Sequence, residues 1–206
     1  MTLLKELAAA GNFTAAVKEL ADPLSRRLNL PGVFQLGLVV PDAVAADQTL
    51  QQDMALSPAF MLDTDIGLWI ENGQTIVGGS VRYGFTYHQG YELELIEPRQ
   101  GCEFYARDMH PDGEIFLQHL AVRVSDVDAQ IARLGRLGVP LLVRGRSGAG
   151  PMVGNIAYLD TRAEFGIITE LICTRFLGIS TRLPPPSLAR YMGRRQNRGG
   201  NRVLST

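Results

Sequence analysis

The clearest alternation of apolar and polar side chains covers residues 116–124, FLQHLAVRV, and predicts a half-buried β-strand that carries His119. The next segment, Ser125 to Leu137, repeats apolar residues at helical spacing and ends before Gly138. It predicts an amphipathic helix with Ser125 as its N-cap. Further apolar runs predict three strands, at 139–143, 154–160 and 166–173. The second half of the chain is therefore predicted to form a βαβββ unit.

The first half of the chain shows the same order of patterns. An apolar run at 33–40, VFQLGLVV, predicts a strand, and residues 43–56 predict a helix. Three more strands are predicted, at 66–71, 77–85 and 91–96. The pairs Asn72-Gly73 and Gln89-Gly90 are typical of the turns that join such strands. We therefore expect a second βαβββ unit in this half.

The ends of the chain differ from these two units. Residues 1–30 have a helical pattern that is interrupted near Gly11-Asn12 and ends around Asp22-Pro23, which predicts an accessory pair of helices. We accordingly divide the chain into four parts: an N-terminal helical extension, 1–31; a first βαβββ module, 32–112; a second βαβββ module, 113–178; and a basic tail rich in proline, arginine and glycine, 179–206.

Composition narrows the class of protein. Of the 206 residues, 46% are apolar and 20% are charged, which is enough apolar material for a sizeable core. The net charge of -1 gives no general reason to expect nucleic acid or an anionic membrane as a partner. Cys102 and Cys173 form neither a disulfide framework nor a metal-binding pair. Without a signal peptide or a membrane-spanning run, we expect a cytoplasmic protein.

Two short patterns recur in the two halves. QLGLVV at 35–40 aligns with HLAVRV at 119–124, and ELI at 94–96 aligns with ELI at 170–172. The first match is 84 residues apart (35 to 119) and the second 76 (94 to 170), so the two segments differ by a few residues in length between the matched strands. An internal duplication is the simplest explanation of the two matches.

The alignment makes Gln35 equivalent to His119, and Glu94 equivalent to Glu170. All four side chains can coordinate a divalent metal. Two carboxylates that face inward without a cation would cost roughly several kcal/mol each, which favours a metal site. Glu92 is predicted on the same face as Glu94 and would replace it after a two-residue slip in the alignment, although the shared ELI favours Glu94.

At these residues the chain resembles the vicinal oxygen chelate, or glyoxalase-like, superfamily, over about residues 33–175. The resemblance implies an α+β glyoxalase-like fold in which two βαβββ modules enclose a metal, with Gln35, Glu94, His119 and Glu170 as its ligands, and it implies that homodimers are common. Methylmalonyl-CoA epimerases of this superfamily usually have a histidine at the position of Gln35. The order Gln, Glu, His, Glu is instead similar to eukaryote-type glyoxalase I, but the segment LDTRAEFG before the last strand is closer to the epimerase-like branch.

The resemblance and the ligand types together predict an enzyme. The expected cofactor is a divalent ion (Zn, Ni, Co, Mn or Mg), which would polarise a substrate carbonyl while a carboxylate removes the neighbouring proton. We expect Glu170 to be this base and Glu94 its counterpart on the opposite face. The predicted function is therefore a metal-dependent isomerase, epimerase or lyase acting on a small molecule.

Two other functions remain open from the sequence. One is a metal-free protein of the resistance type that binds a small molecule in the same cleft. The other is a ring-cleaving dioxygenase, which is disfavoured because that branch expects two histidines and one glutamate, whereas position 35 is glutamine.

Overall fold

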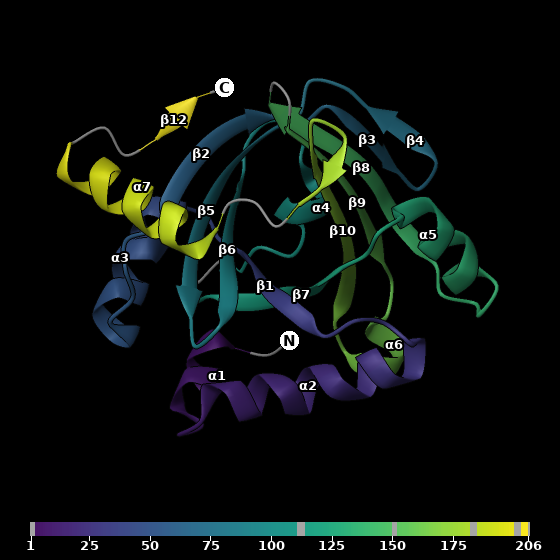
Figure 1. Ribbon diagram of the computed structural model, residues 1–206, viewed down its shortest axis with the longest axis horizontal. Coiled ribbons are helices and arrows are strands. Elements are labelled where there is room, and N and C mark those ends of the chain that lie inside the picture. The colour runs from purple at the N-terminus through teal and green to yellow at the C-terminus, as the bar shows by residue number, and fades with distance from the viewer. Residues whose placement is uncertain (1–2, 111–113, 150–151, 182–184, 200–202, 206) are drawn as a thin grey trace.

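The computed structural model describes residues 3–110, 114–149, 152–181, 185–199 and 203–205. Two copies of one βαβββ unit form its body (Figure 1). The first copy consists of β1 (Val33–Val39), α3 (Ala43–Met54), β2 (Phe60–Asp65), β5 (Ser80–His88) and β6 (Tyr91–Pro98). The second consists of β7 (Phe116–Arg123), α5 (Val127–Gly135), β8 (Leu141–Ala149), β9 (Met152–Leu159) and β10 (Ile168–Phe176). The predicted α+β fold of two such modules is confirmed.

The first strands of the two modules lie side by side at the centre of one curled sheet. β1 and β7 are antiparallel, and each pairs in parallel with the last strand of its own module, β6 or β10. In the central pair Leu36 lies opposite Leu120, Gln35 opposite Ala121 and Gly37 opposite His119. These pairs are related by the 84-residue offset, so the two modules are arranged about an approximate two-fold axis at Leu36 and Leu120.

A β-hairpin from the first module extends the far side of the sheet. β3 (Leu68–Glu71) and β4 (Gln74–Ile76) join at Asn72-Gly73, where both residues have positive φ, as the sequence predicted for this turn. β3 pairs with β8 of the second module, whereas β2, which ends at Asp65, lies near the opposite edge. The chain therefore crosses from one edge of the sheet to the other at residues 66–67 (Figure 1).

Strand alternation gives the sheet two different faces. The outer face carries leucines such as Leu36, Leu93 and Leu120, which pack against buried side chains of α2, α3 and α5. The concave face carries a second cluster, in which Trp69, Phe104, Tyr105 and Tyr158 are buried together. Two of these aromatic residues come from α4 (Glu103–Ala106), a short helix that follows β6.

The N-terminal helices α1 (Leu4–Ala9) and α2 (Phe13–Leu28) run across the outer side of β1 and β7 (Figure 1). Asn12 caps α2 by accepting a hydrogen bond from the Ala15 backbone, so the second helix begins at the interruption that the sequence predicted near Gly11-Asn12. The predicted end at Pro23 is wrong, because α2 continues through this residue for five more positions. Leu24 and Leu28 are fully buried, and their burial offsets the cost of proline within the helix.

The C-terminal segment contains a helix that packs on its own chain. α7 (Pro186–Arg198) lies against β2 and β5, and the Gln196 amide forms two hydrogen bonds with the Met61 backbone. The remaining elements are short: α6 (Arg162–Phe165), β11 (Ile179–Ser180) and β12 (Leu204–Ser205). Among the described residues, no helix has the length and apolar character needed to cross a lipid bilayer.

Two local predictions are corrected by the structure. The N-cap of α5 is Asp126, whose carboxylate accepts from the Ala129 backbone, and not Ser125. β2 was not predicted, because its sequence, FMLDTD, has acidic residues in place of a regular apolar alternation. Asp63 of this strand instead forms an ion pair with Arg82 on the adjacent β5.

Candidate metal centre

A row of buried polar side chains crosses the concave face at the middle of the sheet. It comprises Gln35 on β1, Glu92 and Glu94 on β6, His119 on β7, and Glu170 on β10. The backbone register explains their common face, because directly paired residues project to the same side. Gln35 pairs with Glu92, and Gly37 pairs with both Glu94 and His119.

The register also identifies the equivalent positions of the two modules. Glu94 pairs with Gly37, and Glu170 pairs with Ala121. Gly37 and Ala121 are 84 residues apart, which is the separation of Gln35 and His119. Glu94 is therefore the counterpart of Glu170, as the shared ELI indicated, and the counterpart of Glu92 is Ile168.

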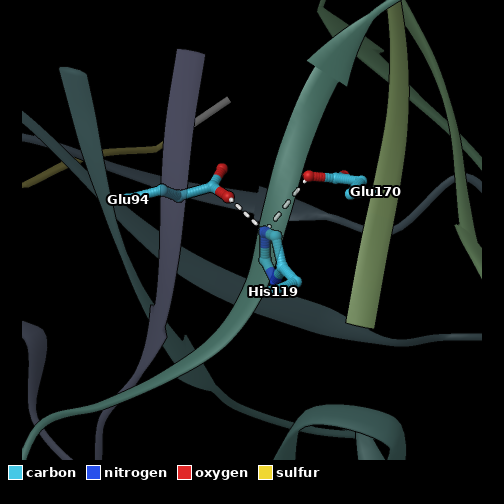
Figure 2. A group of neighbouring side chains, drawn as sticks. All are labelled: Glu94, His119 and Glu170. Carbon is cyan, nitrogen blue, oxygen red and sulfur yellow. Dashed lines mark ion pairs between the residues drawn. The ribbon is translucent and has the colours of Figure 1, made fainter. Parts of the chain in front are cut away.

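His119 lies between two carboxylates (Figure 2). Its Nε2 atom is 3.1 Å from Oε2 of Glu170 and 3.6 Å from Oε2 of Glu94. One ligand atom from each of these three side chains lies within 4.8 Å of the others. Glu94, His119 and Glu170 are thus brought together from three strands and from both modules.

A hydrogen-bonded chain sets the tautomer of His119. Gln118 directs Oε1 at Nδ1 of His119 at 2.9 Å, while its Nε2 donates to Asp108 at 2.9 Å. Because the carboxylate must accept, the amide of Gln118 has one orientation, and Nδ1 of His119 must donate. This leaves Nε2 as the atom that faces Glu94 and Glu170, as expected for a metal-ligating imidazole held by a second residue.

A β-bulge allows the side chain of Gln118 to reach the ring of His119, although consecutive residues of a regular strand project to opposite faces. The register between β1 and β7 shifts from Gly37↔His119 to Leu38↔Leu117, so Gln118 is the extra residue on β7. Phe34, 84 residues earlier, is the extra residue of the matching shift on β1. We did not predict Gln118 as a site residue. The signal in the sequence is the adjacent polar pair Gln118-His119, which interrupts an otherwise regular alternation.

Gln35 lies on the same face, but only part of its amide is bonded. Nε2 donates to Oε1 of Glu92 at 2.6 Å. Oε1 of Gln35 is buried and accepts no hydrogen bond. Tyr87 donates its hydroxyl to the other oxygen of Glu92. Gln35 is therefore positioned by a carboxylate and retains a free acceptor inside the protein.

Burial and the two carboxylates control the charge of the site. Burial raises the pKa of Glu94 to about 7, with Glu170 adding to the increase and His119 opposing it. For His119, burial lowers the pKa, but attraction by Glu170 and Glu94 outweighs burial and raises the pKa to about 9. At neutral pH and without a metal, His119 therefore carries a proton that balances part of the carboxylate charge.

Aromatic rings border this group of side chains. The Tyr158 ring meets the His119 ring edge-on, with 5.1 Å between their centroids, and Tyr158 pairs with Glu170 in the sheet. The hydroxyls of Tyr158 and Tyr105 lie 2.7 Å apart, so each phenol has a polar partner. His119 itself is completely buried. The environment is therefore of low dielectric, which strengthens interactions between charges.

Three of the four predicted ligands contain a buried atom for which the structure gives no hydrogen bond: Oε1 of Gln35, Nε2 of His119 and Oε2 of Glu170. The last two atoms face each other at 3.1 Å, so a shared proton or a cation is needed between them. Such atoms are costly in a protein interior unless water or an ion satisfies them. Two carboxylates, one imidazole nitrogen and one amide oxygen form a donor set that suits a divalent cation. The residues present therefore fit a bound metal.

Comparison with known proteins agrees with this fold. The sequence profile of the Glyoxalase/Bleomycin resistance protein/Dioxygenase superfamily matches residues 34–157. No curated protein sequence matches the chain significantly.

Similar solved structures include the methylmalonyl-CoA epimerase of Mycobacterium tuberculosis, with 21% identity over 69% of this chain and 87% of the other, and a TM-score of 0.45. A Streptomyces coelicolor methylmalonyl-CoA epimerase variant in complex with 2-nitronate-propionyl-CoA has 19% identity over 74% of this chain and 99% of the other, with a TM-score of 0.46. A hypothetical protein from Bacillus halodurans has 18% identity over 68% of this chain and 91% of the other, with a TM-score of 0.45. Because the superfamily profile covers more than half of its residues, the chain belongs to the Glyoxalase/Bleomycin resistance protein/Dioxygenase superfamily.

Proposed function

We propose that the protein is a metal-dependent isomerase, epimerase or lyase that removes a proton next to a carbonyl group of a small molecule. The observation that carries the proposal is the position of His119, whose buried Nε2 lies 3.1 Å from Glu170 and 3.6 Å from Glu94, so that three ligand atoms converge on one point. Membership of the superfamily and the unpaired oxygen of Gln35 support the same conclusion.

Gln35, Glu94, His119 and Glu170 would hold the cation. When bound, a divalent ion supplies a Lewis acid that withdraws electron density from a carbonyl oxygen and so acidifies the neighbouring C–H. The ligand atoms are mostly oxygen with one nitrogen, which is compatible with Zn, Ni, Co, Mn or Mg. Gln118 and Asp108 would keep Nε2 of His119 directed into the site, because they fix its other nitrogen as a donor.

Glu170 is the proposed base. Its Oε2 atom is buried and faces Nε2 of His119 at 3.1 Å, so a substrate held at the same point would meet a carboxylate oxygen that can accept its proton. Glu94 approaches the same point from the other module, so its carboxyl group is the proposed acid on the opposite side. A base and an acid on opposite sides of one carbon atom would allow epimerisation or a 1,2-proton shift.

The first test is metal content. The purified protein and the variants His119→Ala and Glu170→Ala are analysed for bound elements, as isolated and after incubation with each candidate ion. We expect about one ion per chain in the parent and its loss in both variants, because each removes a proposed ligand. His88→Ala and Glu19→Ala, which alter residues away from the site, are the matched controls and should retain the ion. A parent protein that binds no ion under any condition would overturn the proposal in favour of metal-free binding.

The second test is proton exchange. The loaded protein is incubated in deuterated water with a panel of 2-oxo acids and acyl thioesters, and deuterium at the carbon next to the carbonyl is followed by NMR. We expect exchange with the parent, and a loss of roughly 100-fold or more for Glu170→Gln, which keeps the size of the side chain but removes its basicity. Retained exchange in Glu170→Gln with its metal still bound would exclude Glu170 as the base.

A further inference from the structure

Three side chains form a row across the first module, at the edge of the candidate metal centre. Tyr87 on β5, Glu92 on β6 and Gln35 on β1 are direct partners in the sheet register. Glu92 accepts from Nε2 of Gln35 at 2.6 Å and from the Tyr87 hydroxyl through its other oxygen. Glu92 is only 6% exposed, so both of its oxygens are used within the protein. The two hydrogen bonds stabilise the buried Glu92, because burying a carboxylate without hydrogen-bond donors would be costly.

The second module supports its own first-strand residue in a different way. His119 is oriented by Gln118, whose counterpart in the first module is Phe34. Gln35 is oriented by Glu92, whose counterpart in the second module is Ile168. Each candidate ligand on a central strand therefore has one orienting partner, and the two partners occupy positions that are not equivalent. The two modules therefore carry ligand-capable side chains at equivalent positions but support them in different ways.

From this geometry we infer that Glu92 is a positioning residue that fixes which end of the Gln35 amide is presented to the cation, an inference that rests on the proposed metal site. An amide has a donor end and an acceptor end of nearly equal size. Because Glu92 accepts from Nε2, the Oε1 atom is left as the unbonded end. The opposite orientation would place Oε1 against the Glu92 carboxylate and present an NH₂ group, which cannot ligate a cation. Tyr87 acts one step further away, by holding the second oxygen of Glu92.

The test is a double-mutant cycle read out as metal affinity. Glu92→Leu removes the acceptor and is expected to weaken metal binding by about 10- to 100-fold, the usual effect of losing an outer-shell partner. Gln35→Met removes the amide, and in this background Glu92→Leu should have no further effect, because the group through which it acts is gone. An equal loss of affinity in both backgrounds would overturn the positioning role and assign Glu92 a purely structural one.

Conservative variants separate the hydrogen bond from the charge and from folding. Glu92→Gln retains an acceptor for Gln35 and is expected to lose less affinity than Glu92→Leu. Tyr87→Phe should produce a loss in the same direction, while Tyr91→Phe, on the other face of β6, should match the parent. If Glu92→Leu does not fold, Tyr87→Phe still decides the matter, and an unchanged affinity in that variant would count against the inference.

A measurement on the metal-free protein separates this inference from the proposed function. The side-chain NH₂ of Gln35, assigned by NMR through its loss in Gln35→Met, should exchange slowly with solvent in the parent and at least about 10-fold faster in Glu92→Leu. If the parent binds metal and Glu92→Leu binds it equally well, only the role of Glu92 is overturned. No metal binding by the parent would overturn both conclusions, even if the NH₂ group is protected.

Discussion

His119 occupies the space that a side chain at position 37 would need. Gly37 lies directly opposite His119 in the β1–β7 pair, and a Cβ atom on Gly37 would be only 1.9 Å from Cε1 of the imidazole ring. The ring therefore lies across the backbone of the neighbouring strand, at the point where β1 also pairs with Glu94 on β6. Because Gly37 on β1 has no side chain, the ring of His119 on β7 can lie between the two carboxylates.

Gly37→Ala should consequently disturb the site and the core together. The new methyl group overlaps the imidazole, so the ring must move away from Glu94 and Glu170 or the strands must separate. We expect a loss of about 1–3 kcal/mol in the free energy of unfolding in urea, together with loss of metal binding. Gly135→Ala, at the exposed end of α5 with open space around it, is the control and should not destabilise the protein. Normal metal affinity in Gly37→Ala would show that the position of the ring does not depend on this glycine.

Gln118→Leu should weaken metal binding without a large effect on folding. Without the Gln118 oxygen, Nδ1 of His119 has no other hydrogen-bond partner among the described residues, and its proton is free to move to Nε2. We expect a loss of affinity of about 10- to 100-fold by calorimetry. Asp108→Ala should give a smaller loss, because it only allows the Gln118 amide to turn.

The control for this prediction is Gln52→Leu, which changes an exposed glutamine of α3. If Gln118→Leu binds metal as tightly as Gln52→Leu, the hydrogen bonds that link Asp108, Gln118 and His119 do not help to orient His119 for metal binding. NMR of the imidazole nitrogens reports the tautomer directly and should show a proton on Nδ1 in the metal-loaded parent.

The sequence predicted the candidate site better than the details that support it. Alternation at 116–124 predicted a strand that carries His119, an apolar run predicted a strand that carries Glu170, and the repeated ELI related Glu170 to Glu94. These inferences depend only on local periodicity and on duplication, which are both visible in a single chain. The observed register agrees with them, since Gly37↔Glu94 and Ala121↔Glu170 are equivalent pairs.

The supporting residues depend on contacts that local patterns do not encode. Gln118 reaches His119 through a bulge, and Gly37 matters only because a ring from another strand lies over it. Pro23 shows the same limit in a helix, where burial of Leu24 and Leu28 outweighs the local signal to stop. In each case the deciding partner comes from a different part of the chain, so its effect could not be read from neighbouring residues.

The metal-free protein should become less stable as the pH rises from about 4.5 to about 9. Burial raises the pKa of Glu94 from 4.5 to about 7, and the carboxylates raise that of His119 from 6.5 to about 9. The folded state therefore binds more protons than the unfolded state, so the free energy of unfolding falls with pH. The stabilisation that Glu94 contributes to the folded state is fully present below pH 4.5 and is lost as the pH rises through about 7. The stabilisation from His119 is fully present below pH 6.5 and is lost as the pH rises through about 9.

The expected change is on the order of 3 kcal/mol for each group, since one pKa unit corresponds to about 1.4 kcal/mol. Urea denaturation in the presence of a chelator, at intervals from pH 5 to 9, measures it. Glu94→Gln should remove the part of the decline that is due to Glu94 and move the His119 part to lower pH, because Glu94 also helps to raise the pKa of His119. Stability that stays constant or increases between pH 6 and 9 would contradict the proposed charge balance in the metal-free site.

Metal binding should release protons in a number that depends on pH, because a cation and the proton on Nε2 of His119 compete for one position. Between pH 7 and 9, where His119 is protonated and Glu94 is ionised, each ion should displace about one proton, and affinity should rise about tenfold per pH unit. Below pH 7 Glu94 must also lose its proton, so the slope should approach a hundredfold per unit. Calorimetry in two buffers with different ionisation enthalpies counts the protons. Glu94→Gln should release no more than one proton at any pH. Binding by the parent without proton release at pH 8 would show that the cation does not occupy the position between His119 and the carboxylates.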